Sequence, residues 1–384
     1  MSTSSSIQNS ESPPPSVLSE LFEIADIQIN GSRPWDIQIV NPAAYQEILS
    51  GWSLGLGESY MAGYWESDQV DELIARLLAV DLNLQVRGAA KMRVALETVR
   101  AKLINLQSKS RAFQVGEEHY DIGNDIFQQM LDSRMIYSCA YWEKAQDLEQ
   151  AQTHKLEMIC RKLELRPGER LLDIGCGWGG LAAHAARHHG VSVKGVTISK
   201  EQQQFAERAC ADLPVEIVLM DYRDINETFD KVVSVGMFEH VGQKNYTDYF
   251  NTASRLLTDQ GLFLLHTIGS DVTTRYTDPW IDKYIFPNGK TPSAVEISQA
   301  LEGRFLIEDW HNFGHDYDKT LMAWHDNFVR SWPSLSQKYG PRFYRMWRYY
   351  LLACAGFFRA RQGQLWQLVL SKRSRRAVYR SVRL

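Results

Sequence analysis

The sequence predicts an α/β protein with a Rossmann-like sheet, a helical insertion and a small N-terminal α/β domain. From residue 170 onward, short apolar runs alternate with segments of helical periodicity, a pattern typical of parallel strands joined by crossover helices. One of these runs leads into a glycine-rich turn that opens a helix. The length of 384 residues also exceeds one ordinary domain and therefore favours two.

The first part of the chain is expected to contain a tail, a small domain and a linker. Residues 1–16 are rich in serine and include three consecutive prolines, which predicts a disordered tail. Residues 17–106 predict the N-terminal domain, and the polar stretch 107–118 predicts a linker. Within this domain the pattern predicts strands at 26–30 and 35–40 and helices at 42–50, 70–81 and 84–106.

Residues 119–384 predict the second, larger domain. An irregular stretch at 269–301 contains three prolines and indicates an inserted lid between the fifth and sixth strands. About forty mostly helical, aromatic-rich residues follow the sixth strand. The strands of this domain are expected at 170–174, 192–198, 216–220, 231–235, 261–268, 305–310 and 365–372, with helices in the first gaps.

Composition excludes several classes of protein. No apolar run approaches the roughly 18 residues that span a bilayer, and the N-terminus lacks the pattern of a signal peptide. The five cysteines form no C-x-x-C pair, so we expect neither a metal site nor a disulfide framework. We therefore also expect a cytoplasmic protein, whose thiols stay reduced. Residues 85–111 carry seven basic side chains against one acid, and the last thirteen residues carry six more. Such clusters bind nucleic acid or anionic membrane; no nucleic-acid motif accompanies them.

The glycine-rich turn is the strongest single signal. Asp173 stands two residues before Gly175-Cys176-Gly177, directly after an apolar strand. Glycine is needed there because a side chain would block a ligand lying on the backbone. D-x-G-x-G-x-G resembles motif I of the class I S-adenosylmethionine-dependent methyltransferases, and this resemblance implies that these residues hold S-adenosylmethionine.

Two further turns fit the same cofactor. After the second strand, where many such enzymes place an acid for the ribose diol, this chain offers Thr197, Ser199 and Gln202 instead. The third strand ends at Asp221, followed by Tyr222 and Arg223, where this fold usually holds the adenine. A carboxylate at this place can accept from the adenine amino group.

Three stretches point to one family: Tyr137–Trp142 (YSCAYW), Gly236–Gly242 (GMFEHVG) and His119–Asn124 (HYDIGN). Together with the turn at 197–199 they closely resemble the bacterial cyclopropane-fatty-acyl-phospholipid synthases, of which the mycolic acid cyclopropane synthases are shorter relatives. The resemblance implies transfer of a methylene group from S-adenosylmethionine to the cis double bond of an acyl chain in a membrane phospholipid. It also implies that Tyr137 and Ser138 touch the cofactor and that the protein is a homodimer.

The family pattern further implies a bicarbonate ion acting as base. The matching residues are Cys139, Glu239, His266, Ile268 (through its backbone) and Tyr317, and Cys354 matches a position long discussed as functional. For both cysteines, buried packing is the competing interpretation, because methyl transfer to an alkene needs no covalent intermediate.

The chemistry explains these residue types. Attack of an alkene on the sulfonium methyl leaves a carbocation, and ring closure then removes a proton from the new methyl group. Bicarbonate has one O–H donor and several acceptor oxygens, so Glu239 can accept from it while His266 and Tyr317 donate. Glu239 and His266 follow neighbouring strands, so both can face one crevice. Aromatic faces could stabilise the cation; the candidates are Tyr137, Phe238, Trp280, Tyr317 and Trp324.

Two other functions remain open from the residues alone. One is a methyltransferase of the same fold acting on a small soluble acceptor, and the other is a non-catalytic lipid-binding protein. For the phospholipid substrate, the basic helix at 85–111 would contact the membrane, and the N-terminal domain at 17–106 would contact the lipid and lift or steer an acyl chain. A solvated basic helix face is the competing interpretation. The protein is expected at the inner face of the membrane as a peripheral protein.

Overall fold

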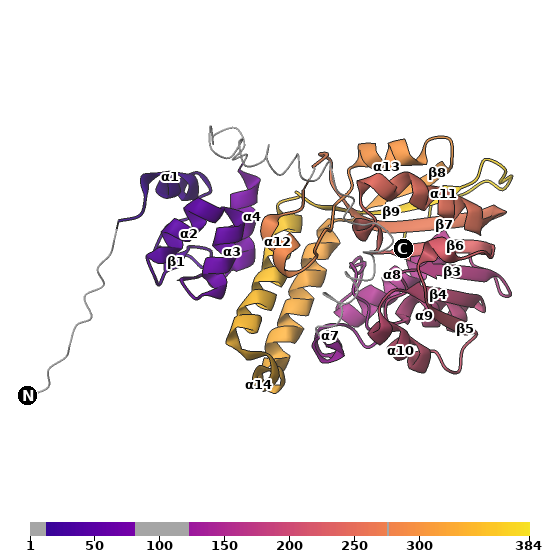
Figure 1. Ribbon diagram of the computed structural model, residues 1–384, viewed down its shortest axis with the longest axis horizontal. Coiled ribbons are helices and arrows are strands. Elements are labelled where there is room, and N and C mark those ends of the chain that lie inside the picture. The colour runs from indigo at the N-terminus through magenta and orange to yellow at the C-terminus, as the bar shows by residue number, and fades with distance from the viewer. Residues whose placement is uncertain (1–12, 81–122, 275) are drawn as a thin grey trace, which may run out of the picture.

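The computed structural model describes residues 13–80, 123–274 and 276–384. Its centre is a seven-stranded sheet in the order β5-β4-β3-β6-β7-β9-β8 (Figure 1). The first five strands in this order are parallel, and β9 runs antiparallel to both β7 and β8. The strands are β3 (Arg170–Ile174), β4 (Ser192–Thr197), β5 (Val215–Leu219), β6 (Phe229–Val235), β7 (Leu257–Gly269), β8 (Leu306–Asn312) and β9 (Gln364–Ser371).

All seven strands predicted for the larger domain are therefore confirmed. The central strands are apolar enough to be buried by helices on both faces of the sheet, whereas the edge strand β8 is largely exposed. On one face, α8 (Leu148–Lys162) and α9 (Gly180–His189) bury residues such as Ile159 and Leu181 against the strands. On the other face, α11 (Tyr246–Leu256) and α13 (Ala294–Leu301) do the same. The remaining helices of the first half are α7 (Asn124–Met130) and α10 (Lys200–Ala209).

The N-terminal segment is a group of four helices that lies away from the sheet (Figure 1, indigo). A single pair of two-residue strands, β1 (Gln38–Ile39) and β2 (Trp65–Glu66), joins it. The helices are α1 (Ser16–Ile24), α2 (Ala43–Gly51), α3 (Ser53–Met61) and α4 (Val70–Ala79). Helices α2 and α4 were predicted; α1 and α3 were not.

The two strands predicted in this segment are wrong in extent. Residues 26–30 form no strand, and only Gln38–Ile39 of the second does. The reason is local polar bonding: the Asp36 carboxylate accepts the backbone N–H groups of Gln28 and Arg33 and pairs with the Arg33 guanidinium. These bonds stabilise a compact turn in place of an extended ladder.

Several predictions fall on residues outside the described part of the chain. They are the first twelve residues of the tail, the basic helix at 84–106, the linker at 107–118 and the first four residues of the His119–Asn124 motif. The predicted tail also included Ser16, where α1 begins.

The inserted segment and the long C-terminal helix connect the two parts of the molecule. The insertion contains α12 (Pro279–Tyr284) and α13. The following α14 (His315–Arg359) bends sharply at Gly340, whose φ of 72° is a left-handed conformation that favours glycine. Its two halves lie side by side in Figure 1, and the rings of Phe328 and Tyr344 stack with centroids 5.7 Å apart.

This hairpin packs against the N-terminal helices. Trp65, Trp347 and Tyr349 belong to one buried apolar cluster that spans both parts. The Arg359 guanidinium also forms ion pairs with Asp71 of α4 and Asp318 of α14. Within the described ranges, no helix is both long and apolar enough to cross a bilayer.

Candidate active site

The glycine-rich turn has the geometry that its sequence predicts. Gly175, Gly177 and Gly179 have φ values of 79°, 54° and 84°, between β3 and α9. A Cβ atom on Gly175 would lie 2.8 Å from Met237, so a side chain would force Met237 to move. The turn therefore presents bare backbone at the carboxyl end of β3.

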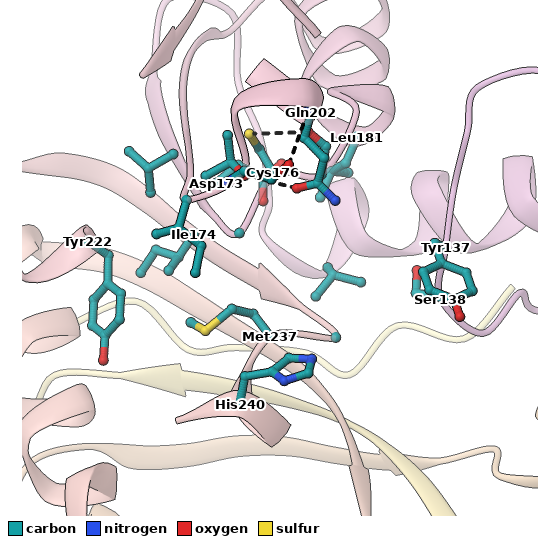
Figure 2. Close-up of a pocket in the computed structure, with 18 of the residues that line it drawn as sticks. Tyr137, Ser138, Asp173, Ile174, Cys176, Leu181, Gln202, Tyr222, Met237 and His240 are labelled. Carbon is teal, nitrogen blue, oxygen red and sulfur yellow. Dashed lines mark hydrogen bonds between the residues drawn. The ribbon is translucent and has the colours of Figure 1, made fainter. Parts of the chain in front are cut away.

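A cavity lies against this turn, and every residue predicted to bind the cofactor lines it. In Figure 2, Asp173 and Cys176 lie above the cavity, Met237 and His240 lie below it, and Tyr137 and Tyr222 lie on opposite sides. The predicted residues that line it are Tyr137, Ser138, Asp173, Gly175, Cys176, Gly177, Thr197, Ser199, Gln202, Asp221, Tyr222 and Arg223.

The turn after β4 is held by its own side chains. The Thr197 hydroxyl donates to the Gln202 side-chain carbonyl over 2.9 Å. The Ser199 hydroxyl accepts the Gln202 backbone N–H and caps α10. Because the Gln202 amide oxygen is occupied, its NH₂ group is the part that can donate to a ligand hydroxyl.

Asp221 is already bound by its neighbour. Both of its carboxylate oxygens accept from the Arg223 guanidinium, at 2.8 and 2.5 Å. The Arg223 backbone N–H also donates to Oδ1 over 2.9 Å, so these bonds orient the carboxylate at the end of β5.

Lys155, which no sequence pattern singled out, lines the cofactor cavity from α8. Its ammonium group donates to the Ser138 hydroxyl over 2.9 Å. Burial lowers the pKa of Lys155 to about 8. Burial also raises the pKa of Asp173 to about 7, although the positive charge of Lys155 acts to lower it. A lysine within an amphipathic helix carries no motif, so only the fold reveals it.

A second, larger cavity of about 750 Å³ lies between the sheet and the N-terminal helices. Its walls are mostly apolar and come from α1, α2, α3, α4, α12 and α14. The apolar side chains include Leu18, Phe22, Ile48, Leu56, Ile74, Leu77, Trp280, Ile281, Leu321, Phe357 and Phe358.

The two cavities adjoin each other. Tyr137, Gly236 and His240 line both of them. The hydroxyl groups of Tyr137 and Tyr350 lie 2.7 Å apart, which fixes the Tyr137 ring at the junction. A reactant in the large cavity could therefore reach one bound against the glycine turn.

Glu239 lies at this junction, in the short 3₁₀ turn Phe238–His240 that follows β6. Its Oε1 accepts the backbone N–H of Ile268 over 2.7 Å. Its Oε2 is buried and has no hydrogen bond among the described residues. Burial raises the pKa of Glu239 to about 7, although the Ile268 amide opposes this rise.

His266 lies two residues before Ile268, on the same side of β7, but it lines neither cavity. Its Nδ1 lies 3.2 Å from the Gln367 side-chain amide nitrogen, which as an NH₂ group donates to it and leaves the proton on Nε2. That Nε2 is buried and has no partner in the part of the chain that the structure describes. Burial, with the charges of Lys155 and Lys162, holds the pKa of His266 well below its usual range.

The other predicted residues lie partly in the wall of the large cavity and partly behind it. Tyr317 and Cys354 line the large cavity from α14, whereas Cys139 is fully buried beside Tyr317 in an apolar cluster that Ile268 also contacts. Burial raises the pKa of Cys354 to about 12 and that of Cys139 well above the usual range, so both thiols are protonated at neutral pH. Protonated thiols are poor nucleophiles, in agreement with a packing role.

The aromatic candidates divide into two groups. Tyr137, Trp280 and Tyr317 line the large cavity. Phe238 and Trp324 line neither cavity: the first stacks on Tyr246, with ring centroids 4.3 Å apart, and the second packs behind Tyr137 at 5.2 Å. Trp324 therefore supports rings that face the cavity, Tyr137 and Tyr317, whereas Phe238 packs in the core of the sheet.

Comparisons with known proteins agree with this geometry. Residues 107–368 match a family model described as mycolic acid cyclopropane synthetase. The cyclopropane-fatty-acyl-phospholipid synthase of Escherichia coli (strain K12) is 56% identical over 356 residues, which cover 93% of this chain and 93% of that protein.

Two solved structures are also similar. The cyclopropane synthase MmaA2 from Mycobacterium tuberculosis has a TM-score of 0.65 and 29% identity, covering 68% of this chain and 98% of its own. The mycolic acid cyclopropane synthase CmaA1, complexed with SAH and CTAB, has a TM-score of 0.64 and 31% identity over the same shares.

Proposed function

This chain belongs to the mycolic acid cyclopropane synthetase family and is an S-adenosylmethionine-dependent cyclopropane synthase, and from that premise we propose its substrate and its base. The substrate is an unsaturated acyl chain of a membrane phospholipid, whose cis double bond becomes a cyclopropane ring. The base is a bound bicarbonate ion. The observation that carries the proposal is the meeting of a glycine-turn cavity and an apolar cavity at Tyr137, Gly236 and His240, with Glu239 lining the apolar cavity next to this junction.

The large cavity supports a lipid acyl chain as substrate. Its size of about 750 Å³ and its apolar walls suit a long hydrocarbon better than a small polar acceptor. The E. coli relative is named for action on a fatty acyl phospholipid. A small soluble acceptor would leave most of this apolar surface in contact with water, which disfavours that alternative.

When bound, S-adenosylmethionine supplies the electrophilic methyl group. The residues of this chain bind and orient it: the backbone of the glycine turn leaves room for it, Gln202 offers an NH₂ donor, and the buried Asp173 and Lys155 lie beside it. The aromatic faces of Tyr137 and Tyr317 line the space where the alkene becomes cationic, and each ring stabilises a nearby cation by about 0.5–2 kcal/mol.

The bicarbonate proposal rests on two buried groups that lack partners. Glu239 Oε2 is an acceptor without a donor, and His266 Nε2 is a donor without an acceptor. An ion with one O–H and several acceptor oxygens would satisfy both, whereas each group left unpaired costs about 1–3 kcal/mol. Bicarbonate, when bound, supplies the base that takes the proton from the new methyl group. Glu239 and His266 hold it, with the Tyr317 hydroxyl as a third contact.

Membrane contact and a homodimer are further parts of the proposal. The basic stretch 85–111 lies outside the described residues. In the C-terminal stretch, Lys372, Arg375 and Arg383 already form ion pairs with acids of the same chain, which leaves Arg373, Arg376 and Arg380 as the better candidates for anionic lipid.

The test is turnover with vesicles. Purified protein is incubated with S-adenosylmethionine, bicarbonate and vesicles of phosphatidylglycerol bearing one cis double bond per acyl chain. We expect acyl chains that gain the mass of one CH₂ group and resist mild hydrogenation, because a ring persists where an alkene is reduced. Methylation of soluble amines at a higher rate than of vesicles would contradict the lipid assignment, and turnover independent of bicarbonate would contradict the base.

A further inference from the structure

A second cluster of chemically active side chains lies between α8 and α9, outside both cavities. Ligand atoms of Cys160, His184 and His189 all lie within 4.8 Å of one another. The Glu157 carboxylate oxygen lies 3.1 Å from His189 Nε2 and 3.7 Å from His184 Nε2. None of these residues lines the cofactor cavity or the large cavity.

Two residues of this cluster, Cys160 and His184, are buried, and one nitrogen of His184 lacks a hydrogen bond within the described part of the chain. Cys160 is fully buried and His184 is 7% exposed. His184 Nε2 has no hydrogen bond among the described residues, although it points toward the Glu157 carboxylate. Such an atom is costly unless something binds it.

The side-chain types suit a cation. Imidazole nitrogens coordinate metal ions in their neutral form, and a thiol loses its proton when it binds one.

We propose that Cys160, His184, His189 and Glu157 bind a divalent transition metal ion of the zinc class and so tie α8 to α9. One thiolate, two imidazoles and a carboxylate form a ligand set that zinc prefers, and hard ions such as Mg²⁺ or Ca²⁺ do not. Zinc bonds of about 2.0–2.3 Å place tetrahedral ligand atoms about 3.5 Å apart, so Cys160, His184 and His189 would move inward by about 1 Å, and Glu157, which lies outside their 4.8 Å group, by more. The ion would stabilise the fold, because the cluster is remote from the reacting groups.

Two neighbours shape the site. Arg161 donates to the other Glu157 oxygen over 2.6 Å and orients the carboxylate toward the histidines. The His188 ring lies 4.6 Å from that of His184 and is an alternative ligand to His189 on the same helix. Variants of both His188 and His189 are therefore needed to assign the outer position.

The test is a metal titration of the full chain after chelator treatment. Zn²⁺ is added in equimolar steps, and Co²⁺ is used in parallel because a thiolate ligand gives an intense charge-transfer absorption. We expect one ion per chain, that absorption, and a rise in the melting temperature with metal concentration. Cys160→Ser should abolish the absorption, and His184→Gln should weaken binding at least about tenfold.

Matched variants keep the experiment decisive. Cys210→Ser removes another buried thiol, and His154→Gln another histidine of α8; both should bind metal as the parent protein does. If His184→Gln fails to fold, His189→Gln, at 17% side-chain exposure, provides the same readout at an outer position. Absence of stoichiometric binding to the parent protein, or equal binding after Cys160→Ser and His184→Gln, would overturn the proposal.

Discussion

The backbone amide of Ile268 donates to Glu239 Oε1 over 2.7 Å, and this bond ties the end of β7 to the turn after β6. It occupies one oxygen of the carboxylate and leaves the other buried without a partner among the described residues. Contact of the Ile268 backbone with the ion stays a prediction; in the structure its N–H donates to Glu239. It therefore positions the carboxylate that we assign to the ion.

Replacing Glu239 by Gln tests that assignment. The amide can still accept from Ile268, but it carries no charge and places an NH₂ group where an acceptor is needed. We expect ring formation to fall about 10²–10⁴-fold while S-adenosylmethionine binding, measured by calorimetry, is unchanged. Glu207→Gln, on the exposed side of α10, is the control. Equal turnover in both variants would remove Glu239 from the mechanism.

The pH profile follows from the same carboxyl group. Because burial raises the pKa of Glu239 to about 7 and the ionised form must accept from the ion, kcat/KM should rise roughly tenfold per pH unit below about 7 and then level off. Bicarbonate is kept saturating at each pH. A flat profile between pH 5 and 7 would contradict this role.

The free energy of unfolding should fall over the pH range in which kcat/KM rises. The unfolded carboxyl has a pKa near 4.5, so between about 4.5 and 7 the folded state binds more protons than the unfolded state. The free energy of unfolding therefore falls as the pH rises through this window and is constant above it. We expect a shallower fall in Glu239→Gln, measured by urea unfolding at several pH values.

Lys155 should matter for cofactor binding. Lys155→Met removes the only charge that opposes the raised pKa of Asp173 and the donor to Ser138. We expect the affinity for S-adenosylmethionine to fall at least about tenfold, since losing one partner of a buried charge costs several kcal/mol. Lys162→Met removes an equally buried cation of α8 that pairs with Asp309, and it should leave this affinity unchanged.

The cavity assignment predicts a dependence on size at Cys354. Cys354→Ser keeps the volume and should retain turnover within about threefold, because a protonated thiol contributes no nucleophile. Cys354→Trp should fill the apolar cavity and lower kcat/KM for lipid more than about tenfold. Cofactor affinity serves as the control. A large loss in Cys354→Ser would instead indicate a chemical role for the sulfur.

A substitution in the N-terminal helices should destabilise the protein where these helices pack against the inserted segment. A Cβ on Gly57 would lie 2.4 Å from the Trp280 ring, so Gly57→Ala should destabilise the packing of α3 on α12 by about 1–3 kcal/mol. Gly51→Ala, whose nearest neighbour would be 3.9 Å away, should cost less. Thermal unfolding measures the difference.

The catalytic sheet could be predicted because each of its strands is a short apolar run bounded by turns. The cofactor cavity could be predicted because its residues follow β3, β4 and β5 directly. Lys155 could not, because a buried lysine of α8 resembles a solvated one in sequence. The strands expected near residues 26–40 do not form at that length, because the Asp36 carboxylate accepts backbone N–H groups of the same turn.

The cysteine pattern gave no indication of the metal site that we propose. Spacing rules detect ligands that are close in sequence, whereas Cys160 and His184 come from two helices that only the fold brings together. For the same reason, the N-terminal helices could not be assigned to the cavity wall before the structure placed α1 and α14 beside it.

The large cavity takes its walls from nearly the whole length of the chain, from Leu18 of α1 to Phe357 and Phe358 of α14. During synthesis on the ribosome, the helices that form its outer wall emerge long before the hairpin that closes it. A nascent or truncated chain ending before α14 would expose the apolar faces of α3 and α4 to water. The protein can therefore take up a lipid only after translation is almost finished. Until then, we expect chaperones to bind the same exposed apolar surface.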